Sequence, residues 1–146
     1  ATSTVNVSFT AVGTCTVSTT PVNFGSGGGT GYTVNGNGDV TVNCTSGLPY
    51  SISLDAGLHL GGYYPNMRSI TNGSTYRPYG LYYTSSSSTS WGDSDYANTF
   101  PGGASVADTG NGANQAHTVY GYLDFSQTII MPVGAYSDTV TVTVNY

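Results

Sequence analysis

The clearest alternation of apolar and polar positions lies at the two ends of the chain. Near the start, every second residue is apolar: Val5, Val7, Phe9 and Ala11. The finish repeats this pattern with Val140, Val142, Val144 and Tyr146. A period of two is typical of a strand with one buried side and one solvent-facing side. We therefore predict strands at residues 5–11 and 140–146, and we expect the second to be held by structure up to its last residue.

Shorter apolar segments, separated by turn residues, lie between these ends. They predict strands at residues 14–17, 22–24, 40–44, 50–54, 79–83 and 117–125. A turn is predicted at Asn35-Gly-Asn-Gly-Asp39 and another at Ser46-Gly-Leu-Pro49. Residues 25–31, 85–90 and 102–112 are rich in glycine or small polar residues and are predicted to be surface loops. Because no repeat or interdomain linker interrupts the chain, about seven such strands indicate one antiparallel β-sandwich.

The composition supports an all-β fold. The 146 residues fit one domain, and Gly, Ser, Thr and Asn make up close to half of them. Lys and Glu are absent. This mixture favours strands and turns over helices, and it excludes helical bundles and βαβ folds.

The charge excludes several kinds of partner. The formal net charge is −5, and Arg68 and Arg77 are the only Lys or Arg residues. The charge therefore argues against nucleic acid and disfavours an anionic membrane surface as partners, because both require clustered cations. No apolar run approaches the roughly 20 residues that span a bilayer, so no membrane insertion is predicted. The chain begins at Ala1 without Met, and we expect a mature, processed protein.

The two cysteines predict a disulfide. Cys15 and Cys44 belong to no C-x-x-C pair and no Cys/His cluster, so a zinc site is not predicted. A structural disulfide would imply an oxidising compartment and would contribute about 3–4 kcal/mol. The alternative is a pair of unpaired buried thiols.

No set of residues indicates catalysis, a cofactor or a metal. His59 and His117 are the only imidazole bases and no nucleophile motif accompanies them, so we expect ordinary polar residues at strand edges. Asp93 and Asp95 are best explained as turn formers rather than as paired catalytic carboxylates or calcium ligands. The glycine-rich residues 25–31 lack the Lys-Ser/Thr of a phosphate-binding loop. The chain is predicted not to be an enzyme.

Aromatic residues gather in the central region, and they allow two interpretations. The set comprises Tyr63, Tyr64, Tyr76, Tyr79, Tyr82, Tyr83 and Trp91. They could form a platform on which sugars stack, as in a secreted carbohydrate-binding β-sandwich. Alternatively they fill the core and line subunit contacts, since Tyr buries area and keeps a polar tip. No alternation places them all outside, so the second interpretation is favoured.

Several short motifs follow one another along the chain. The longest is Pro132-Val-Gly-Ala-Tyr-Ser-Asp-Thr-Val-Thr-Val-Thr-Val-Asn-Tyr146. Supporting motifs are Cys15-Thr-Val-Ser18, Phe24-Gly25, Val40-Thr-Val-Asn-Cys44 with Thr45, Tyr79-Gly-Leu-Tyr-Tyr83, Trp91-Gly-Asp93 and Val119-Tyr-Gly121. Together they span nearly the whole chain, and in this order they resemble the spore coat protein U domain family, which includes the pilins of archaic chaperone–usher pili. The long loop after Gly102 and the very low charge depart from a typical member.

The resemblance implies an incomplete immunoglobulin-like antiparallel sandwich, completed by a donor strand from a neighbouring subunit. Residues 1–12 would be the donor-strand extension, with Val5, Val7, Phe9 and Ala11 facing the neighbour's groove. Residues 13–146 would be the pilin domain, with Val140, Val142, Val144 and Tyr146 in the acceptor groove. A periplasmic chaperone would fill the groove until the outer-membrane usher exchanged it for the next subunit's extension. Periodicity alone leaves open that residues 5–11 fold back into their own domain.

The function implied is that of a structural subunit. The resemblance identifies a major shaft subunit of a surface pilus on a Gram-negative cell, exported through the periplasm and serving adhesion and biofilm formation. One domain is expected of a shaft subunit, because a tip adhesin would carry a second, receptor-binding domain. Its partners would be identical or homologous pilins in a head-to-tail polymer, besides chaperone and usher. The alternatives are the carbohydrate-binding module and a coat protein of the same fold that assembles without an usher.

Overall fold

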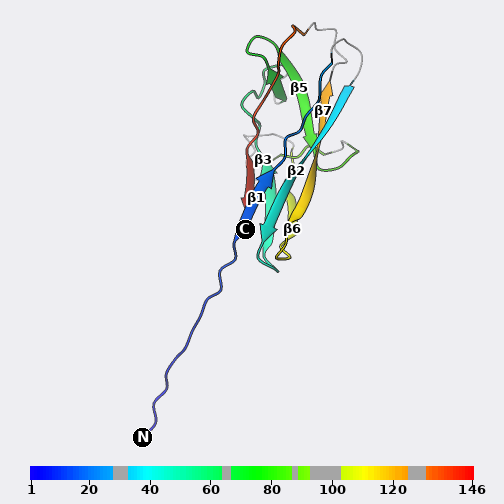
Figure 1. The fold of residues 1–146 in the computed structure, drawn as a ribbon. Helices are drawn as coiled ribbons and strands as arrows, with labels where there is room; N and C mark the ends of the chain where they lie inside the picture. The colour runs from blue at the N-terminus through cyan, green and yellow to red at the C-terminus, as the bar shows by residue number, and fades with distance from the viewer. Residues whose placement is uncertain (28–32, 64–66, 87–88, 93–102, 125–130) are drawn as a thin grey trace.

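The computed structural model describes residues 1–27, 33–63, 67–86, 89–92, 103–124 and 131–146. Within these ranges every regular element is a β-strand, so no described segment is a helix that could cross a membrane. The strands (Figure 1) are β1 (Cys15–Thr19), β2 (Thr33–Cys44), β3 (Pro49–Leu54), β4 (Arg68–Thr71), β5 (Tyr76–Tyr82), β6 (Val106–Thr109), β7 (Gln115–Asp124) and β8 (Val142–Asn145). The all-β class predicted from the composition is confirmed.

The strands form two antiparallel sheets. The larger has the order β1-β2-β7-β5-β4, and the smaller has the order β6-β3-β8. Strand β1 is an edge of the first sheet and β8 is an edge of the second. Within the described residues, each pairs with a strand on one side only. Strands β4 and β6 are the other two edges. The outer sides of β1 and β8 therefore have backbone groups that are available for pairing.

Apolar side chains from the inner faces of both sheets form one core. Its buried members are Val40, Val42, Cys44, Tyr50, Ile52, Leu54, Ile70, Tyr79, Leu81, Trp91, Val119 and Leu123. The Trp91 indole is fully buried, and its Nε1 donates a hydrogen bond to the carbonyl oxygen of Ile52 at 3.0 Å. This bond satisfies the single donor of the ring inside the core.

The predicted disulfide is present. Cys15 and Cys44 lie directly opposite each other in the β1–β2 register, with their Cα atoms 4.1 Å apart. The bond fixes the edge strand β1 to β2 at the point where the N-terminal residues leave the body. The alternative of two unpaired thiols is wrong.

The two predicted features between β1 and the middle of β2 are wrong. Residues 35–39 were expected to be a turn but lie inside β2, and residues 22–24 form no strand. The glycines explain both differences. Gly36 and Gly38 face inward from β2, where a Cβ at position 38 would lie 2.6 Å from the carbonyl oxygen of Thr20. The missing side chains let the chain cross the inner face of the sheet close to its backbone.

Two strands fall where none was predicted. Strand β6 lies inside residues 102–112, which were expected to form a loop, and it pairs with β3. Strand β4 contains Arg68 and pairs with β5. Each has only four residues and therefore too few positions to show a period of two. Other predicted strands, at residues 14–17, 50–54 and 79–83, are confirmed within one to three residues. The strand predicted at residues 117–125 corresponds to β7, which begins two residues earlier. Phe125 lies outside the described residues.

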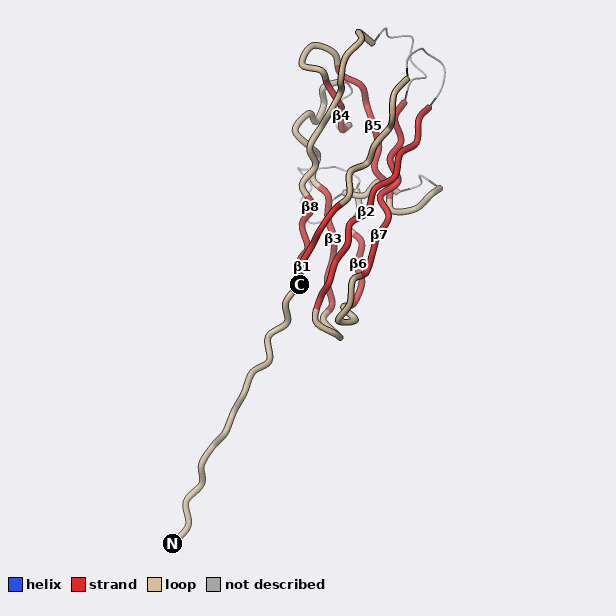
Figure 2. The backbone as a smooth tube through the Cα atoms, in the orientation of Figure 1, coloured by secondary structure: helices blue, strands red, loops and turns tan. Residues whose placement is uncertain are grey.

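The first 12 residues lie outside the sandwich and are all exposed. They belong to no strand and extend away from the body as a single thread (Figures 1 and 2). The side chains of Val5, Val7 and Phe9 are 87%, 92% and 91% exposed. In this chain, therefore, the alternating segment does not fold back onto its own sandwich.

Candidate functional site

An open groove of about 840 Å³ runs along the sandwich and reaches its core. Its floor consists of the core residues Val40, Leu54, Ile70, Tyr79, Leu81, Val119 and Leu123. Residues 19–27 form one side, here called the N-terminal wall, and residues 131–142 form the other, the C-terminal wall. The N-terminal wall begins at the end of the edge strand β1, and the C-terminal wall ends at the start of the edge strand β8. The groove therefore lies along the seam where the two sheets have unpaired edges.

The N-terminal wall is positioned by polar bonds at its start and by close packing beyond them. The Thr20 amide donates to the carbonyl oxygen of Asp39 at 2.9 Å, and the Asp39 amide donates to Thr20 Oγ1 at 2.8 Å. Val22 and Phe24 then pack half-buried against the core. The Phe24 ring meets the edge of Tyr79, with 6.3 Å between ring centroids. These side chains give the wall an apolar inner side.

The C-terminal wall is tied to the body by backbone bonds at its middle and near its end. Thr71 and Ser137 exchange two backbone hydrogen bonds of 3.1 and 3.0 Å. Further along, the Asp55 amide donates to the Thr141 carbonyl oxygen at 3.0 Å, and the Thr141 amide donates to Asp55 Oδ1 at 2.9 Å. Between these points the described residues form no backbone bond from the wall to the body.

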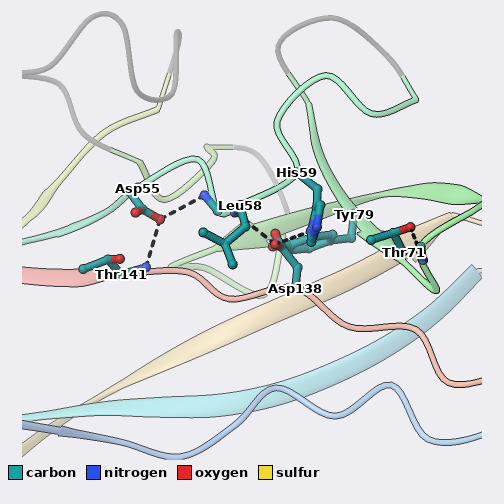
Figure 3. A network of polar contacts seen from close by, with 9 residues as sticks. Asp55, Leu58, His59, Thr71, Tyr79, Asp138 and Thr141 are labelled. Carbon is teal, nitrogen blue, oxygen red and sulfur yellow. Dashed lines mark hydrogen bonds and ion pairs between the residues drawn. The ribbon is translucent and has the colours of Figure 1, made fainter.

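The Asp138 side chain anchors the wall between those two points. This residue belongs to a mostly exposed segment, yet its side chain is only 2% exposed. Tyr79 donates its hydroxyl to Oδ2 at 2.6 Å, the Leu58 amide donates to Oδ1 at 3.0 Å, and His59 Nδ1 lies 2.8 Å from Oδ1 (Figure 3). Three groups, two from the turn after β3 and one from β5, thus converge on one carboxylate. Gly57 allows this approach, because a Cβ there would collide with the carboxylate and its φ of 72° disfavours other residues.

Burial shapes the electrostatics of this anchor. Burial, and then the hydrogen bond to Asp138, raise the pKa of Tyr79, so its hydroxyl stays protonated and can donate. The fully buried Arg68 lies in the same region. Its guanidinium donates to the backbone carbonyl oxygens of Leu54, Asp55 and Trp91.

Burial lowers the pKa of Arg68 to about 10, while the nearby Tyr79, Asp55 and Asp138 act in the opposite direction. The guanidinium therefore remains charged at neutral pH. It holds the end of β3 beside the C-terminal wall. The rarity of Lys and Arg in this chain marks Arg68 as unusual. The pattern of apolar and polar residues, however, did not predict that its side chain is buried in the core.

Two of the four predicted groove residues line the groove, and the other two do not. Val140 and Val142 line the groove. Val144 packs half-buried against the core but is not part of the lining, and Tyr146 is 63% exposed. The N-terminal wall was not predicted as part of the groove. Its only signal was the short alternation of Val22 and Phe24, which had been assigned to a strand.

The other candidate residues fall into ordinary structural positions. His59 lies in a turn rather than at a strand edge, and His117 lies within β7 with its Nε2 2.9 Å from the Tyr50 hydroxyl. Of the aromatic set, Tyr79 and Trp91 are buried in the core and cannot belong to a sugar-stacking platform, whereas Tyr63, Tyr76, Tyr82 and Tyr83 are partly exposed. Asp93, Asp95 and Tyr64 lie outside the described residues.

The fold and the groove define a class of protein: an immunoglobulin-like antiparallel sandwich with an open apolar seam and an alternating extension outside its own body. A family model for the Spore Coat Protein U domain matches residues 1–143, and the chain belongs to this family. The predicted resemblance is confirmed. Membership makes the chain a structural, non-enzymatic protein, as its residues predict.

Among solved structures, one similar chain comes from the crystal structure of the CsuC–CsuE chaperone–tip adhesion subunit pre-assembly complex, from the archaic chaperone–usher Csu pili of Acinetobacter baumannii. The identity is 24% and the TM-score is 0.63. The match covers 92% of this chain but only 40% of that one. This likeness supports the immunoglobulin-like fold. No curated protein gives a match.

Replacing Asp138 should loosen the C-terminal wall. Asp138→Ala removes the acceptor of three donors and leaves the Tyr79 hydroxyl without its partner in the core. We expect the free energy of unfolding to fall by about 3 kcal/mol. Guanidinium unfolding followed by circular dichroism measures this change. Thr139→Ala, at the exposed neighbouring position, is the matched control and should change stability by less than about 0.5 kcal/mol. Equal stability of the two variants would show that Asp138 does not anchor the wall.

Proposed function

We propose that this chain is a structural subunit of an archaic chaperone–usher pilus and that it polymerises by donor-strand exchange. One observation carries the proposal: the body has an open groove that reaches its core, while the same chain holds an alternating apolar segment out in solvent. The groove lacks a strand to cover its apolar floor, and the N-terminal segment lacks an apolar surface to cover its side chains. A subunit that carries both can be repeated without limit, which is the property required of a shaft.

In the proposed polymer, residues 1–12 of one subunit occupy the groove of the next. Val5, Val7, Phe9 and Ala11 face the apolar floor, and the backbone of this donor strand pairs with the edges left open by β1 and β8. Burying the three large side chains contributes roughly 5–9 kcal/mol by transfer bookkeeping. The ladder of backbone hydrogen bonds adds to this and removes the unpaired edges. The body that accepts the donor comprises residues 13–146.

The contact is head-to-tail, because donor and groove are different surfaces. Such a contact generates an open fibre when its rotation does not close into a ring. Val140 and Val142 contact the donor directly in this arrangement. Val144 and Tyr146 continue the same edge toward the end of the chain, beyond the deepest part of the groove.

The open groove also explains why assembly would need partners. Before polymerisation, an apolar groove beside unpaired strand edges is an aggregation hazard. A periplasmic chaperone would fill it, and an outer-membrane usher would replace the chaperone by the next subunit. The disulfide fits the oxidising periplasm of a Gram-negative cell. The product is a cell-surface pilus that serves adhesion and biofilm formation.

The proposal is tested by producing the chain in Gram-negative cells with and without a chaperone–usher pair and imaging the cell surface by negative-stain electron microscopy. We expect filaments only when chaperone and usher are present. Filaments without the usher would instead favour the coat-protein alternative. A soluble monomer under both conditions would overturn the proposal.

A further inference from the structure

A second hollow lies on the outer face of the larger sheet, which is the side facing away from the core and the groove. It has a volume of about 360 Å³. Asn35 and Asn37 of β2 line one side, and Tyr120 and Tyr122 of β7 line the other. They form two directly opposed pairs, Asn35 with Tyr122 and Asn37 with Tyr120. Four side chains from a two-strand ladder thus line one small space, together with Gly121 and Ser85.

The polar groups around this hollow are unused by the fold. Within the described part of the chain, neither the two carboxamides nor the two tyrosine hydroxyls have a hydrogen-bond partner. Both asparagines are exposed and Tyr122 is 36% exposed. These groups are therefore available to a ligand.

A third ring extends the aromatic side of the hollow. Tyr82 of β5 lies opposite Tyr120 in the ladder, and its side chain folds back over Gly80, where a Cβ would lie 2.6 Å from the Tyr82 hydroxyl. Gly80 in turn lies opposite Tyr122. The missing side chain at position 80 thus lets a third ring lie beside the other two, and the aromatic surface continues from β7 onto β5.

The charge of the molecule restricts the ligand. None of the residues that line the hollow is acidic or basic. The chain has no Lys, and its two Arg side chains are fully buried in the core. Asp39, next on the same face of β2 and hydrogen-bonded to Thr118, adds a negative charge nearby. Phosphorylated, sulfated and carboxylated ligands therefore find no counter-charge here.

We propose that this hollow binds a neutral saccharide. Tyrosine rings offer apolar faces to the C–H side of a sugar ring, and each Asn carboxamide both donates and accepts hydrogen bonds, as vicinal hydroxyl groups require. Aromatic walls with a few convergent polar groups are typical of small-molecule sites. The site lies on the opposite side of the sheet from the groove and does not depend on donor-strand exchange. In a polymer it would recur in every subunit, so weak single contacts would act together.

The test uses the assembled full-length protein on immobilised oligosaccharides, measured by biolayer interferometry. The neutral probes are cellohexaose, maltohexaose, chitohexaose and mannohexaose, and the anionic probes are heparin and hyaluronan fragments. We expect binding to at least one neutral probe and none to the anionic ones. Tyr122→Ala and Asn37→Ala should each weaken binding at least about tenfold, while Tyr122→Phe, which keeps the ring, should weaken it less. Thr41→Ala, on the same face of β2 but outside the hollow, is the matched control and should leave binding unchanged.

Two results would overturn the proposal. One is the absence of binding to every neutral probe at about 10 mM. The other is binding that survives Tyr122→Ala and Asn37→Ala unchanged, which would place the site elsewhere. If Tyr122→Ala instead abolished lateral association of polymers without any saccharide binding, the hollow would be a contact between copies and the proposal would be wrong. Thermal unfolding midpoints equal to that of the parent protein establish that the variants are folded.

Discussion

Removing residues 1–12 is expected to abolish polymerisation and to leave a body that is soluble only in complex with a chaperone. The truncated chain keeps the groove but has lost the segment that would fill the groove of the next subunit. Size-exclusion chromatography and electron microscopy of the truncated protein, co-produced with chaperone and usher, measure the loss. A synthetic peptide of residues 1–12 added in trans should restore thermal stability, because it supplies Val5, Val7 and Phe9 to the groove.

The matched control for this experiment is a peptide of the same composition in which the alternation is broken. Because a period of two places every apolar side chain on one side of a strand, the rearranged peptide cannot face all of them toward the groove. It should stabilise the truncated protein much less. A truncated protein that stays monomeric, soluble and as heat-stable as the parent without any partner would contradict donor-strand exchange.

Phe9→Asp is expected to block assembly of the otherwise intact chain. In the proposed polymer the Phe9 ring contacts the apolar floor of the groove, and a carboxylate there would be buried without a partner. The cost is several kcal/mol, so the equilibrium between subunit and polymer should shift by at least about 100-fold toward the subunit. The amount and length of fibres formed at a fixed subunit concentration, counted by electron microscopy, measure the effect.

Ser8→Asp is the matched control for that variant. It introduces the same charge at the neighbouring position, which alternation places on the solvent side of the donor strand. Fibres should form normally from this variant. If Phe9→Asp gave fibres of normal length and stability, the prediction that Phe9 faces the groove would be wrong. This conclusion would hold whether or not Ser8→Asp forms fibres.

The groove combines an apolar interior with polar anchors outside it. Its floor is core surface, which gains stability when covered, whereas its C-terminal wall is held by Asp55 and Asp138 through hydrogen bonds to the body. Directional bonds can hold a wall open at a fixed place, which contact between apolar side chains alone does not do. A preformed groove would spare the donor strand part of the ordering cost of binding. The Asp138→Ala variant separates this contribution from the apolar one.

Local patterns predicted the parts of the fold that depend on near neighbours. The alternation in residues 50–54 marks β3, and the aromatic-rich residues 79–83 mark most of β5. The Asn-Gly-Asn-Gly-Asp segment shows where such patterns fail. In isolation it favours a turn, but Gly36 and Gly38 serve as space for a crossing chain, and the ladder with β7 keeps them extended. Long-range packing overrode the local preference there.

The sequence by itself determined that this chain is all-β, that its two ends alternate, and that Cys15 and Cys44 could join. These properties follow from composition and from a period of two, which any local segment displays. Only the tertiary structure decided that the segment around Val7 does not pack against its own sandwich. It also decided that Asp138 is buried and that residues 19–27 face residues 131–142 across a groove. The reason is physical: alternation shows which side of a strand is apolar, but what covers that side depends on contacts between residues far apart in the chain.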